Sequence, residues 1–233
     1  MISKKSYAQL EGSSRHKKAS KIASILGCFV NFSKCDVLDI GVGSGHIASD
    51  LARKSKSLVG VDLYDERVIK SGYLFKKVDD EYLPFNNSKF DVVISNHVIE
   101  HISNQTLHVN EISRVLKNGG ILYLATPNKY WLFDPHSKLP LISWFSRRVS
   151  SIYLKLFENK KWDIYPLSYR KIKRLFKNHF EIYNMTYEII KNPKKYHLDV
   201  FLKIQPLFSL FPSFLLKLLF SLVPTYVLIM RKK

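Results

Sequence analysis

Two observations predict an α/β fold, in which a mostly parallel sheet is covered by helices on both faces. First, short apolar runs alternate with segments of helical periodicity throughout residues 37–126, as successive βαβ units do. Second, the apolar run of residues 35–40 leads into three glycines at alternate positions, Gly41, Gly43 and Gly45, after which apolar residues recur at helical spacing. A strand, a glycine turn and a helix in this order let a ligand approach the backbone closely.

The remaining elements follow from periodicity and turn chemistry. Helices are expected at residues 15–32, 46–54, 65–71, 103–116 and 169–177, with Ser103 and Ser168 as N-caps. Strands are expected at residues 35–40, 58–62, 73–78, 89–95, 121–125, 180–190 and 226–233. The Asn-Gly-Gly sequence at 118–120 should end the helix that precedes the fifth strand.

The composition divides the chain into four parts. Residues 1–34 form an N-terminal arm and helix, and residues 35–126 form the core just described. Residues 127–166 have no clean period, contain prolines and are rich in aromatic residues, so we expect a lid inserted over the strand ends. Residues 167–233 complete the fold and contain an apolar segment.

The chain is strongly basic, with 37 Lys and Arg against 19 Asp and Glu and a formal net charge of +18. Such a field favours anionic partners: nucleic acid, an anionic membrane surface or phosphorylated substrates. Many of the basic residues lie in 147–177, interleaved with aromatic side chains. This mixture is typical both of nucleic-acid surfaces and of proteins that lie on anionic lipid, and a solvated basic face would look the same.

The apolar tail favours the membrane over nucleic acid. Between residues 206 and 230 the only charged residue is Lys217, but prolines interrupt the stretch before it is long enough to cross a bilayer. We therefore expect an interfacial helix over 212–222, with packing on the sheet as the alternative. Two cysteines close together, Cys28 and Cys35, favour a reducing compartment, so the predicted location is cytoplasmic, peripheral on the inner face of the membrane.

The glycine turn differs from the dinucleotide-binding fingerprint. That fingerprint needs a glycine at position 46, where this chain has His46, and it has no counterpart to Asp39. An acid at Asp39 can reach a cationic or hydrogen-bond-donating ligand. A second acid, Asp62, follows the next strand 17 residues after Gly45, where it can accept hydrogen bonds from ribose hydroxyls.

Five segments resemble, in order, the motifs of the class I S-adenosylmethionine-dependent methyltransferases. They are Asp39-Ile-Gly-Val-Gly-Ser-Gly45, Val59-Gly-Val-Asp62, Asp79-Asp-Glu-Tyr-Leu-Pro-Phe85, Phe90-Asp-Val-Val-Ile-Ser95 followed by Val98-Ile-Glu-His101, and Leu116-Lys-Asn-Gly-Gly-Ile-Leu122. The resemblance covers about residues 30–130. It implies a Rossmann-like sheet of seven strands, mostly parallel with an antiparallel last strand, and S-adenosylmethionine as the cofactor.

The resemblance also implies a set of cofactor-binding residues. Asp62 matches the acid that binds the ribose, and Asp79 matches the acid near the adenine amino group. The full set is Asp39, Gly41, Gly43, Gly45, Asp62, Leu63, Asp79, Asp80 and Asn96. A sulfonium gives up its methyl group readily, so catalysis should rest on proximity and in-line orientation, with a base where the acceptor is a weak nucleophile.

Two histidines are the candidate bases, His101 near the methyl acceptor and His136 in the lid. The segment from His97 to His101 also matches the inverted zinc-protease pattern, but it directly follows a strand rather than lying on a helix. Related quinone-pathway O-methyltransferases bind a divalent metal through a Glu at the position of His97 together with the later Glu-His. Because that Glu is replaced here, no metal is predicted.

The lid suggests the acceptor. Pro127-Asn128, Asp134-Pro-His136, Leu139-Pro140 and Trp144 are similar to a methyltransferase branch found with polysaccharide and lipid-linked sugar biosynthesis. The predicted reaction is O-methylation of a glycan or a lipid-linked small-molecule intermediate. A quinone-pathway or an RNA methyltransferase is the alternative enzyme, with nucleic acid the less favoured partner. A catalytically silent methyltransferase-like domain that acts as a membrane or partner adaptor is the alternative of another class.

Overall fold

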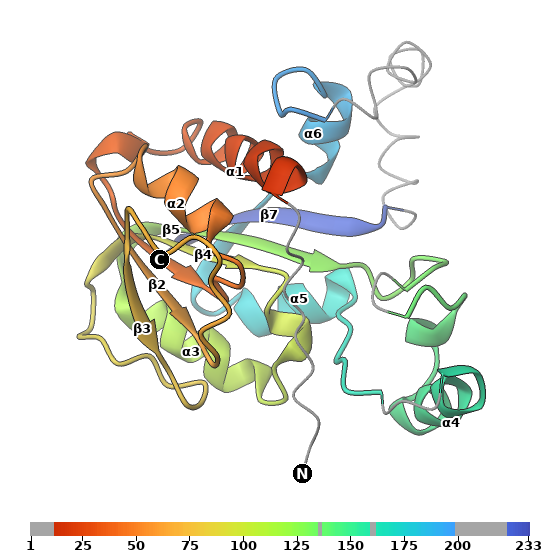
Figure 1. The fold of residues 1–233 in the computed structure, drawn as a ribbon. Helices are drawn as coiled ribbons and strands as arrows, with labels where there is room; N and C mark the ends of the chain where they lie inside the picture. Colours follow the sequence, from red (N-terminus) through yellow and green to blue (C-terminus); the bar gives the residue numbers. More distant parts are fainter. Residues whose placement is uncertain (1–11, 135–136, 159–161, 199–222) are drawn as a thin grey trace.

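A computed structural model describes residues 12–134, 137–158, 162–198 and 223–233, and its centre is a seven-stranded sheet (Figure 1). The strands are β1 (Asp36–Ile40), β2 (Ser57–Asp62), β3 (Leu74–Lys77), β4 (Phe90–Asn96), β5 (Leu116–Pro127), β6 (Phe180–Asn184) and β7 (Thr225–Lys232). Their order is β3-β2-β1-β4-β5-β7-β6. The first five strands run parallel, and β7 is antiparallel to both of its neighbours. The predicted sheet, with its antiparallel last strand, is confirmed.

Helices cover both faces of this sheet. The α-helices are α1 (Gly12–Leu26), α2 (His46–Ala52), α3 (Gln105–Val115), α4 (Arg147–Glu158), α5 (Tyr169–Phe176) and α6 (Thr186–Lys191). Short 3₁₀ helices are η1 (Phe32–Lys34), η2 (Ile99–His101) and η3 (Ile142–Trp144). α1, α2 and α6 pack on one face and α3 and α5 on the other, whereas α4 lies beside this layered body (Figure 1).

The two faces divide the core because alternate strand residues point to opposite sides. In β4, Val92 and Ile94 belong to the cluster under α1 and α2, whereas Val93 belongs to the cluster over α3 and α5. Every one of these side chains is fully buried. A strand covered on both faces needs apolar residues at successive positions, which is why the run over β4 is uninterrupted.

The strand order creates a crevice for the site. β2 lies on one side of β1 and β4 on the other, so the chain leaves the carboxyl ends of β1 and β4 in opposite directions. Ligands of open α/β sheets bind at such a switch point. The glycine turn follows β1 directly, and η2 follows β4 after two residues.

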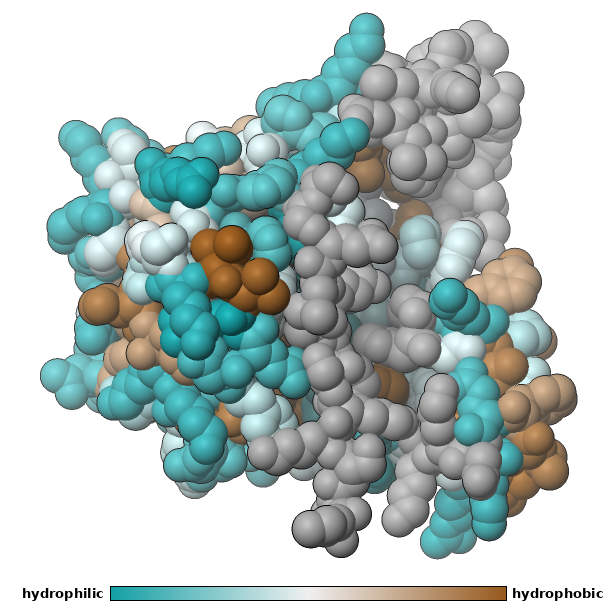
Figure 2. Space-filling model, viewed as in Figure 1, coloured by the Kyte–Doolittle hydropathy of each residue, from teal (hydrophilic) through white to brown (hydrophobic). Residues whose placement is uncertain are grey.

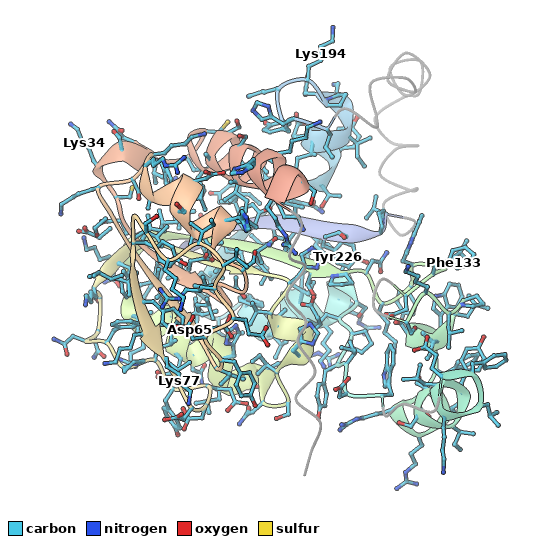
Figure 3. The ribbon with its side chains drawn as sticks, in the orientation of Figure 1. Lys34, Asp65, Lys77, Phe133, Lys194 and Tyr226 are labelled. Atoms are coloured by element: carbon cyan, nitrogen blue, oxygen red, sulfur yellow. The ribbon has the colours of Figure 1, made fainter. Side chains whose placement is uncertain are left out.

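The predicted helix over residues 65–71 is wrong, because this segment is an irregular loop. Local polar contacts replace the helix: the carboxylate of Asp65, labelled in Figure 3, accepts a hydrogen bond of 2.8 Å from Nε of Arg67. The Arg67 guanidinium also lies 3.8 Å from the centroid of the Phe75 ring. The backbone N–H groups of residues 68 and 69 both donate to the carbonyl of Ser44. The loop is therefore held against the glycine turn.

Three elements begin or end at residues other than those predicted. The N-cap of α3 is Asn104 rather than Ser103, and its side chain accepts a hydrogen bond of 3.1 Å from the backbone N–H of Leu107. β5 begins at Leu116, before the glycines that were expected to precede it. The helix expected to end at residue 32 ends at Leu26. Ser168 caps α5 as predicted.

Only the first half of the strand expected over residues 180–190 is a strand in the structure. β6 ends at Asn184, whose side-chain oxygen accepts a hydrogen bond of 3.0 Å from the N–H of Thr186 at the start of α6. The Thr186 hydroxyl in turn accepts a bond from the N–H of Val227 on β7. A local side-chain turn thus ends the strand and begins a helix where apolar residues alone suggested a continuing strand.

The predicted lid begins where β5 ends. Asn128 is buried, donates 2.9 Å to the carbonyl of Val223, and accepts 2.7 Å from the hydroxyl of Tyr226, which Figure 3 labels at the near end of β7. The lid has its own small core of Ile142, Leu154, Trp162 and Ile164. The expected interfacial helix over 212–222 lies outside the described residues.

Candidate functional site

A pocket of about 630 Å³ opens at the carboxyl ends of β1, β2 and β4, which is the size range of small-molecule sites. Its walls come from the glycine turn, the ends of β2 and β4, the segment after β3, η2 and one side of α1. The predicted cofactor residues that line it are Asp39, Gly41, Gly43, Asp62, Leu63, Asp79, Asp80 and Asn96. The crevice that the topology creates is therefore where the predicted residues meet.

The glycine turn needs glycine for two reasons. Gly41 has φ +77° and Gly43 has φ +54°, in the left-handed region that side chains disfavour. A Cβ on Gly41 would also overlap the Val98 side chain, which follows the neighbouring strand β4. The turn thus brings bare backbone to the pocket surface.

Gly45 has a different role from the one predicted. It does not line the pocket, and it is the N-cap of α2 with φ +82°. A Cβ there would overlap the carbonyl oxygen of Ile69 and press on the hydroxyl of Tyr73. This glycine therefore lets the loop after β2 pack against the turn, and the spacing of the motif alone could not separate this packing role from ligand contact.

Asp62 links the first two strand ends. One carboxylate oxygen accepts 2.8 Å from the N–H of Gly43, and the other accepts 2.8 Å from the N–H of Leu63. Burial raises the pKa of Asp62, and these backbone donors offset part of that rise. The backbone N–H of Tyr64 is a third donor to this carboxylate, so Asp62 is held rigidly and can still accept a hydroxyl group.

Asp39 is a buried acid at the floor of the pocket. It is 4% exposed, and burial together with the nearby charge of Asp62 raises the pKa of Asp39 to about 7. An acid in this state is poised to ionise when a cation arrives beside it. The two acids therefore make this end of the pocket suitable for a ligand that carries positive charge and hydroxyl groups.

The segment after β3 supplies the rim near Asp62. Asp79 and Asp80 line the pocket together with two apolar side chains, Val78 and Leu83, which are largely buried. Asp80 accepts 2.8 Å from the N–H of Tyr82, which folds the segment into a turn. Apolar side chains beside carboxylates form a surface that suits a flat heterocycle with amino groups.

The wall from β4 carries the predicted base. His101 is the last residue of η2 and lines the pocket with His97. Glu100 between them is fully buried, lies 3.3 Å from Nδ1 of His97, and accepts 3.0 Å from the hydroxyl of Thr126 on β5. Burial alone would raise the pKa of Glu100, but the His97 hydrogen bond and the charges of both histidines outweigh it and lower this pKa.

The lid is joined to the same wall. The backbone carbonyl of Glu100 accepts 2.7 Å from the N–H of Tyr165, and the Gln105 side chain donates to the carbonyls of Ile99 and Tyr165. Asp163, two residues earlier, lines the pocket. His136, the second predicted base, lies outside the described residues. Within the described ranges, no three His, Cys, Asp or Glu side chains are grouped to hold a metal ion.

Three further residues of the pocket were not predicted. Arg15 and Lys18 reach it from α1, and burial together with repulsion from neighbouring cations lowers the pKa of Lys18 to about 8. His108 reaches it from α3, where burial lowers its pKa to about 4 and keeps it neutral, with Nε2 3.5 Å from the hydroxyl of Ser95. The basic first half of the N-terminal helix was the one sequence signal for Arg15 and Lys18.

Comparison with known proteins finds similarity over the strands that form this pocket. Residues 38–124 match the family described as "Methyltransferase domain". A "Probable S-adenosylmethionine-dependent methyltransferase" of Mycolicibacterium smegmatis is 30% identical over 135 residues, which cover 55% of this chain and 52% of that protein. A "Ubiquinone biosynthesis O-methyltransferase" of Bartonella tribocorum is 28% identical over 109 residues, 43% of this chain and 44% of that protein. The chain thus spans about half the length of the curated relatives it matches.

Solved structures share the fold over nearly the whole chain. The PH0226 protein of Pyrococcus horikoshii superposes with a TM-score of 0.60 and covers 98% of this chain and 95% of its own, at 15% identity. An S-adenosylmethionine-dependent methyltransferase of Mesorhizobium loti has a TM-score of 0.58 and covers 93% of this chain and 99% of its own, at 11% identity. Identities this low show the fold alone.

The strand order is that of the class I methyltransferase fold, and the central residues of the chain match the methyltransferase domain family. The matched residues 38–124 run from β1 through β5 and carry most of the pocket wall. They end before the lid. The family match therefore covers the predicted cofactor-binding residues, whereas Arg15, Lys18 and Asp163 of the pocket wall lie outside it.

Proposed function

We propose that this chain transfers the methyl group of S-adenosylmethionine to an oxygen of a small glycan or a lipid-linked intermediate. The observation that carries the proposal is one pocket that joins the glycine turn, Asp39 and Asp62 to His101. When bound, the cofactor supplies an electrophilic methyl group on a sulfonium. Positioning and orientation are then the main work of the protein.

The two ends of the pocket divide the work. The backbone of Gly41 and Gly43 admits the cofactor, Asp62 accepts its ribose hydroxyls, and Asp79 binds the adenine edge. Asp39 ionises beside the positive charge of the amino-acid part. The fit rests on the exposed backbone, the rigidly held carboxylate of Asp62 and the pKa of Asp39 near 7.

The acceptor meets the opposite wall. His101 takes the proton from the acceptor hydroxyl, because an alcohol is a weak nucleophile until its proton is removed. Lys18 and Arg15 hold an anionic group of the acceptor, such as a phosphate. Both cations line the pocket, and both are on α1 rather than on the strands that carry the acids.

The chain is proposed to act at the anionic inner surface of the cell membrane, where lipid-linked acceptors are found. The formal net charge of +18 supports this location. Among the described residues, no helix has the length and apolarity to cross a bilayer. We propose that the association is peripheral.

A quinone-pathway acceptor is the second candidate, favoured by the similarity to ubiquinone biosynthesis O-methyltransferases. RNA is the third candidate acceptor, and a catalytically silent adaptor is the candidate of a different class. A labelled-methyl transfer assay against separate lipid, glycan and RNA fractions distinguishes them. We expect label in the lipid or glycan fraction. Label in RNA alone would replace the acceptor, and no transfer despite cofactor binding would favour the adaptor.

Calorimetry tests the cofactor half of the proposal. Asp62→Ala should weaken S-adenosylmethionine binding by about 1–3 kcal/mol, the cost of leaving buried hydroxyl groups without their acceptor. The matched control is Asp36→Ala, because Asp36 lies at the amino end of β1, away from the pocket, and pairs with Lys56. Equal affinities of the folded Asp62→Ala variant and the wild type would refute the ribose assignment.

A further inference from the structure

The outer face of α4 and the turn before it expose a continuous set of large apolar side chains. On the helix these are Val149, Ile152, Leu156 and Phe157, with 47%, 62%, 77% and 65% of their surface exposed. Leu141, Trp144 and Phe145 in the preceding segment are also exposed. We call this set the lid face. Figure 2 shows it as hydrophobic surface at the lower right of the molecule.

The exposed apolar side chains of the lid face are distinct from the side chains that α4 buries. α4 has a separate inner side, where Ser150 and Leu154 are buried, and Leu154 packs in the small lid core with Trp162. Residues 149, 152 and 156 are spaced three and four apart and so share one side of the helix. The helix therefore has two apolar sides, of which one meets protein and the other meets solvent.

Basic side chains border this apolar stripe. Arg148 and Lys155 are exposed and lie seven residues apart, two helical turns, so they form a row beside Val149 and Ile152. The one acid of α4, Glu158, is only half exposed and lies near the side of Leu154. This is the arrangement of an interfacial helix, in which apolar side chains enter the acyl boundary and basic ones reach the headgroups.

Aromatic side chains surround the helix at the same end of the molecule. Phe145, Tyr153 and Phe157 contact one another edge to face, with Tyr153 between the other two. Pro140, Leu141 and Phe145 also line a shallow apolar groove with the exposed face of α4. Phe133, labelled in Figure 3, lies on the outer side of the lid. Aromatic rings of this kind settle at the headgroup level of membranes.

We propose that the lid face rests on an anionic lipid bilayer, with Ile152 and Leu156 inserted among the lipids and Arg148 and Lys155 at the phosphates. Charge decides between a bilayer and a second copy of the chain. Two copies would bring two basic rows together, whereas an anionic bilayer neutralises them. This inference rests on the proposed membrane association, but it is independent of methyl transfer.

The lid position explains why such contact would matter. The same lid supplies Asp163 to the pocket wall and is bonded through Tyr165 to η2 beside His101. A bilayer under α4 would hold a lipid-linked acceptor within reach of the pocket. The lid face would therefore favour acceptors that lie in the bilayer, and the pocket would then select among these by shape.

Vesicle sedimentation tests the proposal. The full chain is mixed with vesicles of phosphatidylcholine alone, or of phosphatidylcholine with phosphatidylglycerol, at low and at high salt. We expect binding to the mixed vesicles at low salt that high salt weakens. Leu156→Asp should weaken this binding at least about tenfold, because a leucine that entered lipid becomes a charge.

The matched control is Leu74→Asp on the edge strand β3, because Leu74 is 71% exposed and lies on another part of the surface. It should bind vesicles like the wild type. The double variant Arg148→Gln, Lys155→Gln should bind the mixed vesicles more weakly than the wild type, and its binding should respond less to salt. Equal binding of Leu156→Asp and Leu74→Asp would overturn the proposal, and so would equal binding to neutral and anionic vesicles.

Two measurements without lipid separate the competing occupants. If a second copy covers the lid face, Leu156→Asp would convert a dimer to a monomer in light scattering. If another segment of this chain covers it, Leu156→Asp would lower the melting temperature far more than Leu74→Asp does. Either result overturns the proposal. Calorimetric binding of S-adenosylmethionine is expected to be unchanged in both variants, which keeps a failed membrane test distinct from a failed cofactor site.

Discussion

At the scale of single residues, the proposal assigns the general base to His101. It is the last residue of η2 on the pocket wall, and the buried Glu100 beside it fixes the local backbone through Thr126 and Tyr165. His101→Gln should lower kcat by about 10²–10⁴-fold, the usual contribution of a general base, while calorimetric affinity for S-adenosylmethionine stays within about twofold. The control is His179→Gln, because His179 directly precedes β6 at the edge of the sheet and does not line the pocket.

An unchanged kcat in His101→Gln would show that the acceptor needs no base from this residue. A loss of cofactor affinity equal to the loss of rate would instead assign His101 to binding. The two parameters are therefore measured on the same preparation, with the melting temperature as the check on folding.

The sequence predicts which residues meet in the pocket where their spacing from a strand end or from the glycine turn is enough to place them. Asp39 and Asp62 sit at fixed distances from the glycine turn and from strand ends, so the sequence predicts their meeting in one crevice. Lys18 and His108 belong to helices whose approach to the pocket depends on packing across the whole sheet. Neither follows a strand end, and periodicity makes His108 indistinguishable from a core residue of α3.

At the scale of elements, Gly45 tests how the turn is built. Gly45 and Gly119 share a left-handed backbone, with φ +82° and +73°, but a Cβ at Gly45 would overlap the Ile69 carbonyl, whereas nothing lies within 4 Å of one at Gly119. Gly119→Ala should therefore cost about 1 kcal/mol of unfolding free energy, the cost of the backbone alone. Gly45→Ala should cost at least about 3 kcal/mol, because the loop after β2 must also move.

Chemical denaturation of the ligand-free protein measures both values. Similar losses of unfolding free energy for the two variants would mean that the loop after β2 can move without cost and does not stabilise the glycine turn. Both glycines have a positive φ, so the two variants share the cost of that backbone conformation. They differ in whether the new Cβ meets the Ile69 carbonyl.

The elements that the sequence mispredicts are those where polar side chains make local turns. The loop at 65–71 has helical composition, but the Asp65–Arg67 pair and the two bonds to the Ser44 carbonyl replace helical bonds. The end of β6 follows the same principle, since Asn184 turns the chain toward α6. Side-chain competition with backbone bonds depends on rotamers and on neighbours in space, which apolar periodicity does not record.

At the scale of the whole molecule, the topology was predictable because few arrangements satisfy a chain of right-handed βαβ units. The first five strands could be placed from apolar runs and turn residues, and the antiparallel β7 from the family resemblance. The helix and small core of residues 127–166, the predicted lid, did not follow from the sequence. Its helix α4 has apolar residues on two sides, so it shows no single stripe, and its small core comes from Trp162 and Ile164 beyond the helix itself.

Asp39 should also lower the stability of the whole ligand-free molecule at neutral pH. Burial and the charge of Asp62 raise the pKa of Asp39 to about 7, above the ordinary value of 3.8 that the unfolded chain would show. Between these values the folded protein holds a proton that the unfolded chain has lost. The stabilising contribution is therefore complete below about pH 4 and is lost as the pH rises to about 7.

Asp39→Asn removes this ionisation. We expect the ligand-free variant to be more stable than the wild type by roughly 2–4 kcal/mol at about pH 8, with the difference shrinking toward about pH 5. Denaturant unfolding across this range measures it, with Asp80→Asn as the control because Asp80 lines the same pocket but is exposed. The same substitution should weaken S-adenosylmethionine binding at about pH 8, since a cation favours the ionised Asp39 and wild-type affinity should rise with pH through about 7. A variant that is both no more stable and no weaker in binding would mean that Asp39 ionises without cost, and the acid would then have no part in selecting a cationic ligand.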